Sequence, residues 1–313
     1  MKWADRIGRR VKVRDLHVLL AVAQPGSMAR AADHLAISQP VISKTISDLE
    51  HALGARLLDR TSQGVEPTAY GRAFIDCGIA VFDELRRGVQ QIEFLSDPSV
   101  GEVRIGGAGP LVDELIPATI ARLASRYPQM EFHFTESDTP TLCRLLRERK
   151  LDFVIGRSSM SFLDDDLAAE PLFDDQIFVV AGQENPWSRR RKIALRQLLH
   201  EPWIMPGPDN LVWALIVEGF SAAGLATPTP RVVSNSMAVR IRLVECGNFL
   251  SILPHSTLHF GSRRLRITKL PVVLPMKIRP IEFITLRNRT PNPINKLFIQ
   301  ELRHLAKPLI KKA

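Results

Sequence analysis

The stretch SMARAADHLAISQPVISKTISDLEHALG, residues 27–54, decides the fold of the first part of the chain. Its apolar residues recur at helical spacing on both sides of a short break, which predicts two helices, over residues 28–35 and 39–53. Ala36 and Ile37 leave only a tight connection between them. Two short helices joined in this way form a helix-turn-helix.

Four residues at the ends of these helices support the assignment. Ser27 and Ser38 each precede a helix, where a serine hydroxyl can accept a hydrogen bond from a free backbone N–H group. Pro40 lies in the first turn of the second helix, where its missing N–H group has little consequence. Gly54 follows the last helical residue and suits the left-handed conformation in which many helices end.

The second helix has two chemically different faces. Its apolar residues are spaced by four, three and four positions along one face: Ile42, Ile46, Leu49 and Leu53. Its polar residues lie on the opposite face: Gln39, Ser43, Lys44 and Ser47. Such amide, hydroxyl and ammonium groups can read base edges in the major groove of DNA or reach its phosphates. The periodicity by itself favours the simpler alternative, an ordinary surface helix with a solvated polar face.

Further helices are expected on both sides of this motif. An apolar-rich helix over residues 13–23 precedes it, and Gln63-Gly64 predicts the turn of a small hairpin, or wing, after it. Thr68 is then the cap of a long helix that ends near Ser96.

The long helix carries an apolar stripe with the spacing of a coiled-coil seam, formed by Ile75, Phe82, Leu85, Val89 and Ile92. About 27 residues with a rise of 1.5 Å each give a rod of roughly 40 Å. A helix of this length with an apolar stripe needs a partner, and a second copy of the chain is the simplest one.

After a linker at residues 97–99, short apolar segments alternate with helical ones. Strands are predicted at 103–106, 131–135, 153–155, 177–181, 203–205, 231–233, 250–253 and 281–286. Helices are predicted at 111–126, 141–149, 211–223 and 237–245. This alternation predicts an α/β fold with a mostly parallel sheet.

The residue identities of the N-terminal part resemble the LysR-type transcriptional regulators. The likeness is carried by Leu16-x-x-Leu19, Gly26-Ser27-Met28, Ala31-Ala32, Leu35, Ser38-Gln39-Pro40, Ser43, Ile46, Leu49-Glu50, Leu53-Gly54, Leu57, Arg60 and Thr68-x-x-Gly71. Leu19 and Leu58 depart from it, since the family usually has phenylalanine there. Both changes exchange one apolar core residue for another and leave the predicted motif intact.

The resemblance implies a DNA-binding role for particular residues. They are Ser27, Arg30, Ser38, Gln39, Pro40, Ser43, Lys44 and Arg60. Gln39, Pro40, Ser43 and Lys44 would face the major groove or its rim, and Arg60 would contact the DNA backbone from the wing. The alternatives are that Ser27 and Ser38 only cap helices and that Arg60 only pairs with a neighbouring carboxylate.

The resemblance also implies a domain organisation. A winged helix-turn-helix would span residues 10–67, a linker and dimerisation helix residues 68–96, and an effector-binding domain residues 100–306. The last would contain two Rossmann-like subdomains, about 100–172 with 276–306, and about 173–275, as in periplasmic binding proteins. The implied partners are double-stranded DNA at a promoter or operator, a small-molecule effector, further copies in a homodimer or homotetramer, and RNA polymerase.

In α/β sheets of this kind ligands bind beyond the carboxyl ends of the strands. The residues predicted there are Ala108, Gly109, Ser137, Arg157, Pro206, Asn235 and Ser236. Thr139-Pro140, next to Ser137, is better explained as a helix cap, and Arg157 fits an exposed surface arginine as well as a partner for a ligand carboxylate. The fold analogy and Arg157 together predict an effector that is a small organic acid or a sugar derivative.

The positive charge of the chain is concentrated at its C-terminus. The net charge is +9, and residues 260–313 contain 13 Lys and Arg against 2 Asp and Glu. A solvated basic face is the favoured explanation. The alternatives are a contact with bent DNA and pairing with the acidic segments at 164–166 and 174–175 of a neighbouring subunit.

Composition excludes several other classes. Three widely spaced cysteines, Cys77, Cys143 and Cys246, predict neither a disulfide framework nor a structural zinc site, and they fit a reducing cytoplasm. The apolar run at 18–23 is too short for a signal peptide or a membrane span. The sequence has no Gly-x-Ser-x-Gly, phosphate-loop or His-Glu-x-x-His motif. We therefore expect no enzyme, no cofactor, no metal and no membrane partner. The rival hypotheses are a small-molecule enzyme and an exported binding protein, and both leave residues 13–96 unexplained.

Overall fold

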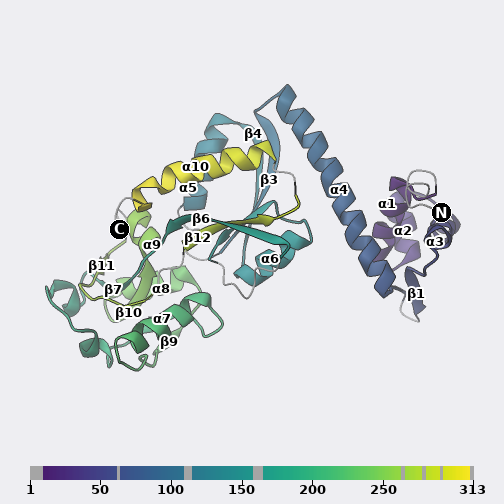
Figure 1. Cartoon of the computed structure of the whole chain (residues 1–313). Coiled ribbons are helices and arrows are strands. Elements are labelled where there is room, and N and C mark those ends of the chain that lie inside the picture. The colour runs from purple at the N-terminus through teal and green to yellow at the C-terminus, as the bar shows by residue number, and fades with distance from the viewer. Residues whose placement is uncertain are drawn as a thin grey trace. The chain divides into compact units, whose positions relative to one another are not determined.

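The computed structural model describes residues 10–61, 64–108, 115–157, 165–261, 265–276, 280–289 and 292–310 (Figure 1). The chain forms two compact units, Met1–Val89 and Gln90–Ala313. No helix in these described ranges is both long enough and apolar enough to cross a membrane. All three cysteines are free.

The first unit is a helical bundle with a two-stranded wing. Its helices are α1 (Val13–Ala23), α2 (Met28–Leu35) and α3 (Gln39–Leu53), and its hairpin consists of β1 (Leu58–Thr61) and β2 (Gly64–Pro67). The apolar residues predicted to face inward are buried, among them Leu19, Ile42 and Leu49. The helix α4 (Ala69–Ser96) follows. The predicted helix-turn-helix, wing and long helix are confirmed.

The helix caps agree with the sequence except at Ser38. The Ser27 hydroxyl accepts from the N–H group of Arg30 at 3.4 Å, and the Thr68 hydroxyl accepts from that of Gly71 at 3.0 Å. Ser38 occupies the N-cap position of α3, but its side chain makes no capping hydrogen bond. The prediction of a serine side-chain cap was therefore wrong for Ser38, and only the backbone position is correct.

Two glycines let backbone segments of the first unit approach closely. The N–H group of Val65, in the wing, donates to the carbonyl of Gly26, between α1 and α2, at 2.9 Å. A Cβ atom on Gly64 would lie 2.3 Å from that same carbonyl oxygen. A Cβ atom on Gly71, in the first turn of α4, would lie 1.9 Å from the carbonyl oxygen of Leu57. Only a residue without a side chain fits these two places.

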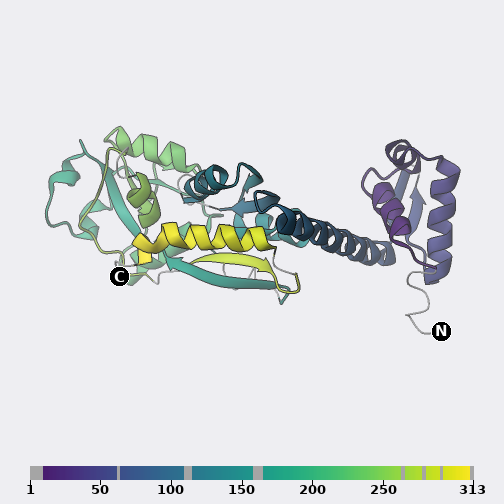
Figure 2. The same cartoon turned by 90° about the horizontal axis from the view of Figure 1, so that it is seen from above.

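The second unit contains a five-stranded sheet in the order β4-β3-β5-β12-β6. The strands are β3 (Val100–Gly107), β4 (Gln129–Glu136), β5 (Phe153–Gly156), β6 (Leu167–Asp174) and β12 (Pro280–Leu286). Helices α5 (Leu115–Arg126) and α10 (Pro293–Ile310) pack side by side on one face, and α6 (Thr139–Arg147) covers the other (Figure 1 and Figure 2). Phe153 and Phe298 are completely buried in the larger of these two cores.

A second group of strands and helices completes this unit. Its strands are β7 (Ile177–Gly182), β10 (Leu250–Pro254) and β11 (Ile267–Lys269) in the order β10-β7-β11, and β8 (Ile204–Met205) paired with β9 (Val232–Val233). Its helices are α7 (Leu211–Ala222), α8 (Met237–Glu245) and α9 (His255–Gly261), with short 3-10 turns at Pro186–Arg189 and Leu195–Leu198. Trp203 and Phe220 are buried at its centre. The chain leaves the first sheet after Asp174 and returns to it at Pro280.

The predicted strands are confirmed, but the prediction of a mostly parallel sheet was wrong. β3 runs parallel to β4 and β5, and β8 runs parallel to β9. β12 is antiparallel to β5 and β6, and β7 is antiparallel to β10 and β11. Two of these strands, β6 and β11, were not predicted. The alternation of strands and helices along the chain predicts parallel pairs, because a parallel pair needs a long crossover between its strands. It does not predict antiparallel pairs between strands that are far apart in the sequence, such as β12 with β6.

We predict that Gly71→Ala destabilises the protein by about 1–3 kcal/mol, because the added methyl group overlaps a backbone carbonyl that cannot rotate away. Gly78→Ala, also in α4, is the matched control, since a Cβ atom there would meet only side-chain atoms of Leu16 and Leu20, at 3.6 Å or more, which is an ordinary van der Waals distance. That change should stabilise the helix by about 0.5–1 kcal/mol. Denaturant unfolding followed by circular dichroism measures both. Equal effects of the two substitutions would contradict the argument.

Candidate nucleic-acid interface and ligand site

The polar face of α3 is directed away from the core of the first unit. Gln39, Pro40, Lys44 and Ser47 are exposed, and Ser43 is half-buried. Ile42, Ile46 and Leu49 on the opposite face have at most 3% exposed surface. Ala31 and Ala32 in α2 are buried where α2 meets α3, so their small side chains allow the two helices to pack closely.

The wing brings a positive charge to this face. The Arg60 guanidinium, in β1, donates to the Ser43 hydroxyl at 3.4 Å. Among the described residues no carboxylate pairs with Arg60, so the structure does not support the alternative of a local ion pair. Arg30 is exposed and donates to the carbonyl of Pro25 at 2.6 Å, and Lys44 has no ion-pair partner in the described part of the chain.

Glu50, on the inner side of α3, fixes the position of the wing. Its Oε1 atom accepts from the backbone N–H groups of Leu57 at 2.7 Å and Leu58 at 3.1 Å. These are the last residue before the wing and its first residue, so the start of β1 is tied to α3. This contact of Glu50 was not predicted, although Leu49-Glu50 belongs to the stretch that resembles the LysR-type regulators.

The three described residues predicted beside the first sheet lie together. The N–H group of Ala108 donates to the carbonyl of Ile155 at 3.0 Å, and that of Ser137 donates to the carbonyl of Gly107 at 3.3 Å. The Thr139 hydroxyl donates to the carbonyl of Arg157 at 3.0 Å. Ala108, Ser137 and Arg157 thus gather at the carboxyl ends of β3, β4 and β5. Gly109 lies outside the described residues. The helix cap predicted at Thr139 was one residue off. Asp138 is the residue that caps α6, because its side chain accepts from the N–H group of Thr141 at 2.8 Å.

Arg157 is buried, with 6% of its surface exposed, so the alternative of a surface arginine was wrong. It donates to the carbonyl of Asp175 and forms an ion pair with the Asp175 carboxylate at 3.4 Å. That carboxylate also accepts from the Ser256 backbone at 2.9 Å and from the Ser256 hydroxyl at 2.8 Å. Burial lowers the pKa of Arg157, and the charge of Asp175 opposes this effect. These contacts tie β5, the β6–β7 connection and the start of α9 together.

The three residues predicted in the second group of strands also lie near one another. The N–H group of Gly207 donates to Oδ1 of Asn235 at 2.9 Å, which places Asn235 beside the buried Pro206-Gly207 segment. The Ser236 hydroxyl caps α8 by accepting from Val239 at 3.4 Å. Asn235 and Ser236 are exposed at the amino end of α8.

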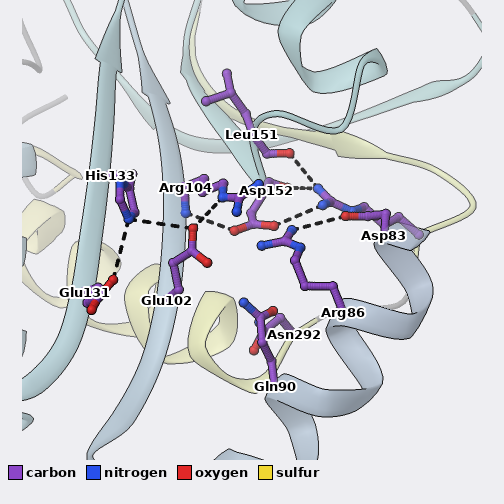
Figure 3. Close-up of polar contacts among 11 residues, drawn as sticks. Asp83, Arg86, Gln90, Glu102, Arg104, Glu131, His133, Leu151, Asp152 and Asn292 are labelled. Carbon is purple, nitrogen blue, oxygen red and sulfur yellow. Dashed lines mark hydrogen bonds and ion pairs between the residues drawn. The ribbon is translucent and has the colours of Figure 1, made fainter. Parts of the chain in front are cut away.

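A separate polar cluster lies on the first sheet (Figure 3). Asp152 accepts from the N–H group of Arg104 at 2.9 Å and from Arg289 at 3.0 Å, and Arg289 also donates to the carbonyl of Leu151 at 2.6 Å. Arg104 in turn pairs with Glu102, which lies 3.7 Å from Nε2 of His133. Asn292 donates to Gln90 at 2.9 Å. Arg104 and Arg289 in this cluster therefore each have a carboxylate partner, Glu102 and Asp152.

The described part of the basic C-terminal segment is engaged within the chain. Arg266 lies 3.6 Å from Glu184, and Lys269 lies 3.3 Å from the centre of the Phe178 ring. Burial lowers the pKa of Lys269. Asp166, in one of the acidic segments, pairs with Arg147 at 2.9 Å. Arg263, Arg264, Lys277 and Arg279 lie outside the described residues, as do residues 311–313.

Comparison with known families identifies both parts of the chain. Residues 13–72 match the family "Bacterial regulatory helix-turn-helix protein, lysR family", and residues 96–307 match "LysR substrate binding domain". The chain belongs to the LysR family of transcriptional regulators. It is therefore a DNA-binding regulator with an effector-binding domain, and the fold predicted from the sequence is confirmed.

Individual relatives agree with the family. The regulator is 27% identical over 270 residues to the HTH-type transcriptional regulator GalR of Pseudomonas putida, covering 86% of this chain and 68% of GalR. It is 26% identical to the regulator TdcA of Escherichia coli, covering 85% and 84% of the two chains. Both relatives are transcriptional regulators.

Solved structures share the fold over nearly the whole chain. A full-length variant of OxyR from Pseudomonas aeruginosa has a TM-score of 0.67 at 22% identity, covering 94% of this chain and 95% of the OxyR chain. CbnR, a LysR family regulator, has a TM-score of 0.60 at 20% identity, covering 94% and 99%. CbnR bound to its target DNA has a TM-score of 0.54 at 22% identity, covering 95% and 100%.

We predict that the Arg157–Asp175 pair of this regulator is strongly coupled. Arg157→Met or Asp175→Asn alone leaves a buried charge without its partner and should destabilise the effector-binding domain by about 3–5 kcal/mol. The double variant removes both charges and should cost less than either single change. Arg144→Met, at an exposed pair with Glu148, is the control and should change stability by about 0–1 kcal/mol. A double-mutant cycle from denaturant unfolding checks this, and additive effects would refute it.

Proposed function

We propose that α3 is the recognition helix and that Arg60 extends its contact surface onto the DNA backbone. The observation that carries the proposal is the division of α3 into a buried apolar face and an outward polar face, with Arg60 of the wing hydrogen-bonded to Ser43 on that face. A solvated surface helix does not require a guanidinium held against its polar side.

The chemistry of this face suits the major groove. An amide such as that of Gln39 can bond to adenine through both of its polar atoms, and a lysine such as Lys44 can reach guanine or phosphate. Arginine supplies a backbone contact that sets the register without reading sequence. Arg30 and Ser27 are assigned to the rim, while Pro40 and Ser38 shape the first turn of the helix.

The double variant Gln39→Ala, Ser43→Ala should lose sequence-specific binding to operator DNA taken from upstream of the gene that neighbours the regulator's own gene. Each lost base contact is worth about 1–3 kcal/mol of discrimination against the wrong base pair. Its thermal midpoint should match that of the wild type, since both side chains lie outside the core. His51→Ala, exposed in the last turn of the same helix, is the control and should bind normally. Electrophoretic shifts with competitor DNA measure the effect. Normal operator binding by the double variant would disprove the assignment of α3.

We further propose that the regulator is a homodimer through α4, assembled further into a homotetramer. Four large apolar residues are exposed in the C-terminal half of α4: Leu85 by 51%, Val89 by 55%, Ile92 by 66% and Leu95 by 76%. They are spaced by four, three and three residues, so they form one stripe. An exposed apolar stripe of this size marks an interaction site, and a second α4 offers a matching surface.

Val89→Glu combined with Ile92→Glu should break this interface, because each change introduces a charge into an apolar seam. Gln91→Glu is the control, since it adds one such charge at an exposed polar position of the same helix. Sedimentation velocity should show a smaller species for the double variant and an unchanged one for the control. An unchanged assembly in the double variant would rule out α4 as the interface.

We propose that the effector is a small organic acid or a sugar derivative. It would bind to the effector-binding domain near the carboxyl ends of β3, β4 and β5 and the amino end of α8. Support comes from the convergence of Ala108, Ser137 and Arg157 in one place, and of Pro206, Asn235 and Ser236 in another. We assign Arg157 a role in positioning the strand ends and not in binding the ligand, because its charge is already paired with Asp175. A contact with RNA polymerase, a cytoplasmic location and the absence of an enzymatic activity remain predictions.

A further inference from the structure

Arg240, in the second turn of α8, is a buried cation for which the described structure provides no anion. Only 4% of its surface is exposed. Its guanidinium has two long contacts, from Nη1 to the carbonyl oxygen of Ile252 at 3.4 Å and from Nη2 to Sδ of Met237 at 3.5 Å. Its Nε atom is buried and has no hydrogen-bond partner. Among the described residues no carboxylate forms an ion pair with it.

The other buried arginines of this unit show what is missing at Arg240. Arg157 is 6% exposed and pairs with Asp175, and Arg289 is 8% exposed and pairs with Asp152 at 3.0 Å. An isolated buried charge is strongly unfavourable unless it is paired. Burial alone lowers the pKa of Arg240 to about 10, which leaves it charged at neutral pH. An anion from outside the chain could therefore supply the missing partner of this buried cation.

We propose that Arg240 binds a carboxylate of the effector, beside the amino end of α8. The side chain of a helical residue points toward the start of its helix, and the contact with Met237 shows that Arg240 does so. The guanidinium is therefore close to the first turn of α8, where the helix favours negative charge. Asn235 and Ser236 precede that turn. The Asn235 amide is already bonded to Gly207 and Asp209, whereas the Ser236 hydroxyl, which accepts from Val239, can still donate its hydrogen to the rest of the ligand.

Met237 is the side chain that would have to move. It is half-buried in the first turn of α8 and covers Nη2 of Arg240. Methionine is unbranched and adopts alternative rotamers readily, so its displacement is a small rearrangement. A single guanidinium balances the charge of one carboxylate group, so one carboxylate of the effector is enough to pair with Arg240.

This inference rests on the proposal that the second unit binds a small effector, and it names the group that the effector presents. The test compares wild type, Arg240→Met and Arg240→Lys, with Arg242→Met as the control. Arg242 lies two residues away in the same helix, its side chain is 83% exposed, and it pairs with Glu245. Each protein is titrated with sodium acetate, sodium malonate and sodium sulfate at constant ionic strength, and the thermal midpoint is recorded.

Wild type and R242M should show a saturable rise with acetate or malonate, of about 3–6 °C at ten times the dissociation constant. R240M should lose this rise, and R240K should keep a weaker one, because lysine retains the charge without the planar fork. Without added anion R240M should unfold at a higher temperature than wild type, since it no longer buries an unpaired charge.

Three results would overturn the proposal. One is an unchanged carboxylate response in R240M. Another is a lower midpoint of R240M without anion, which would make Arg240 a structural residue bonded to Ile252. The third is a wild-type response confined to sulfate, which would exclude a carboxylate. The titration also separates the two proposals. A wild type that responds to none of the three anions contradicts the proposed organic-acid effector, whereas a wild-type carboxylate response that R240M retains contradicts only the role of Arg240.

Discussion

The Asp175 carboxylate holds the effector-binding domain together at the point where the chain passes from one sheet to the other. It accepts two hydrogen bonds from Ser256 and balances the buried Arg157. Three segments that are distant in sequence, after β5, between β6 and β7, and after β10, meet in this one group. A charge buried this deeply is tolerated only when its partners are in place, so these segments assume their positions together. Ala108 and Ser137 are placed beside Arg157 by backbone hydrogen bonds to Ile155 and Gly107.

The first unit uses a carboxylate in a similar way, on a smaller scale. The Glu50 carboxylate accepts hydrogen bonds from the N–H groups of Leu57 and Leu58, where the chain enters the wing. Without this acceptor, two backbone donors would lie partly buried and unpaired. Because Glu50 belongs to α3, the start of the wing is fixed relative to this helix, and Arg60 of the wing is held against Ser43. The groups that we propose for DNA contact therefore depend on an acid that is not one of them.

Periodicity and helix-end chemistry predicted most of the fold, because those signals are local. The helices of the first unit follow from the spacing of Ile42, Ile46 and Leu49 and from Gly54. Strands such as β5 follow from short apolar runs. The strands β6 and β11 and the antiparallel direction of β12 were not predicted, because strand pairing joins segments far apart in the chain and is not visible in the local sequence of either segment. The missing side-chain cap at Ser38 shows a similar limit, since a favourable residue type does not determine its rotamer.

The two arginines of the effector-binding domain show where sequence reasoning about a site ends. Arg157 was singled out because it follows a strand, and it lies at the predicted place, but its charge is balanced by Asp175. Arg240 lies inside a helix with apolar residues on either side, where nothing in the sequence separates it from a surface cation such as Arg242. Their difference is in the surroundings: Arg242 is exposed and paired, while Arg240 is buried without an acid among the described residues. Whether a charge is balanced is a property of the folded structure, so the residue that we propose as the ligand's partner can be recognised only in that structure.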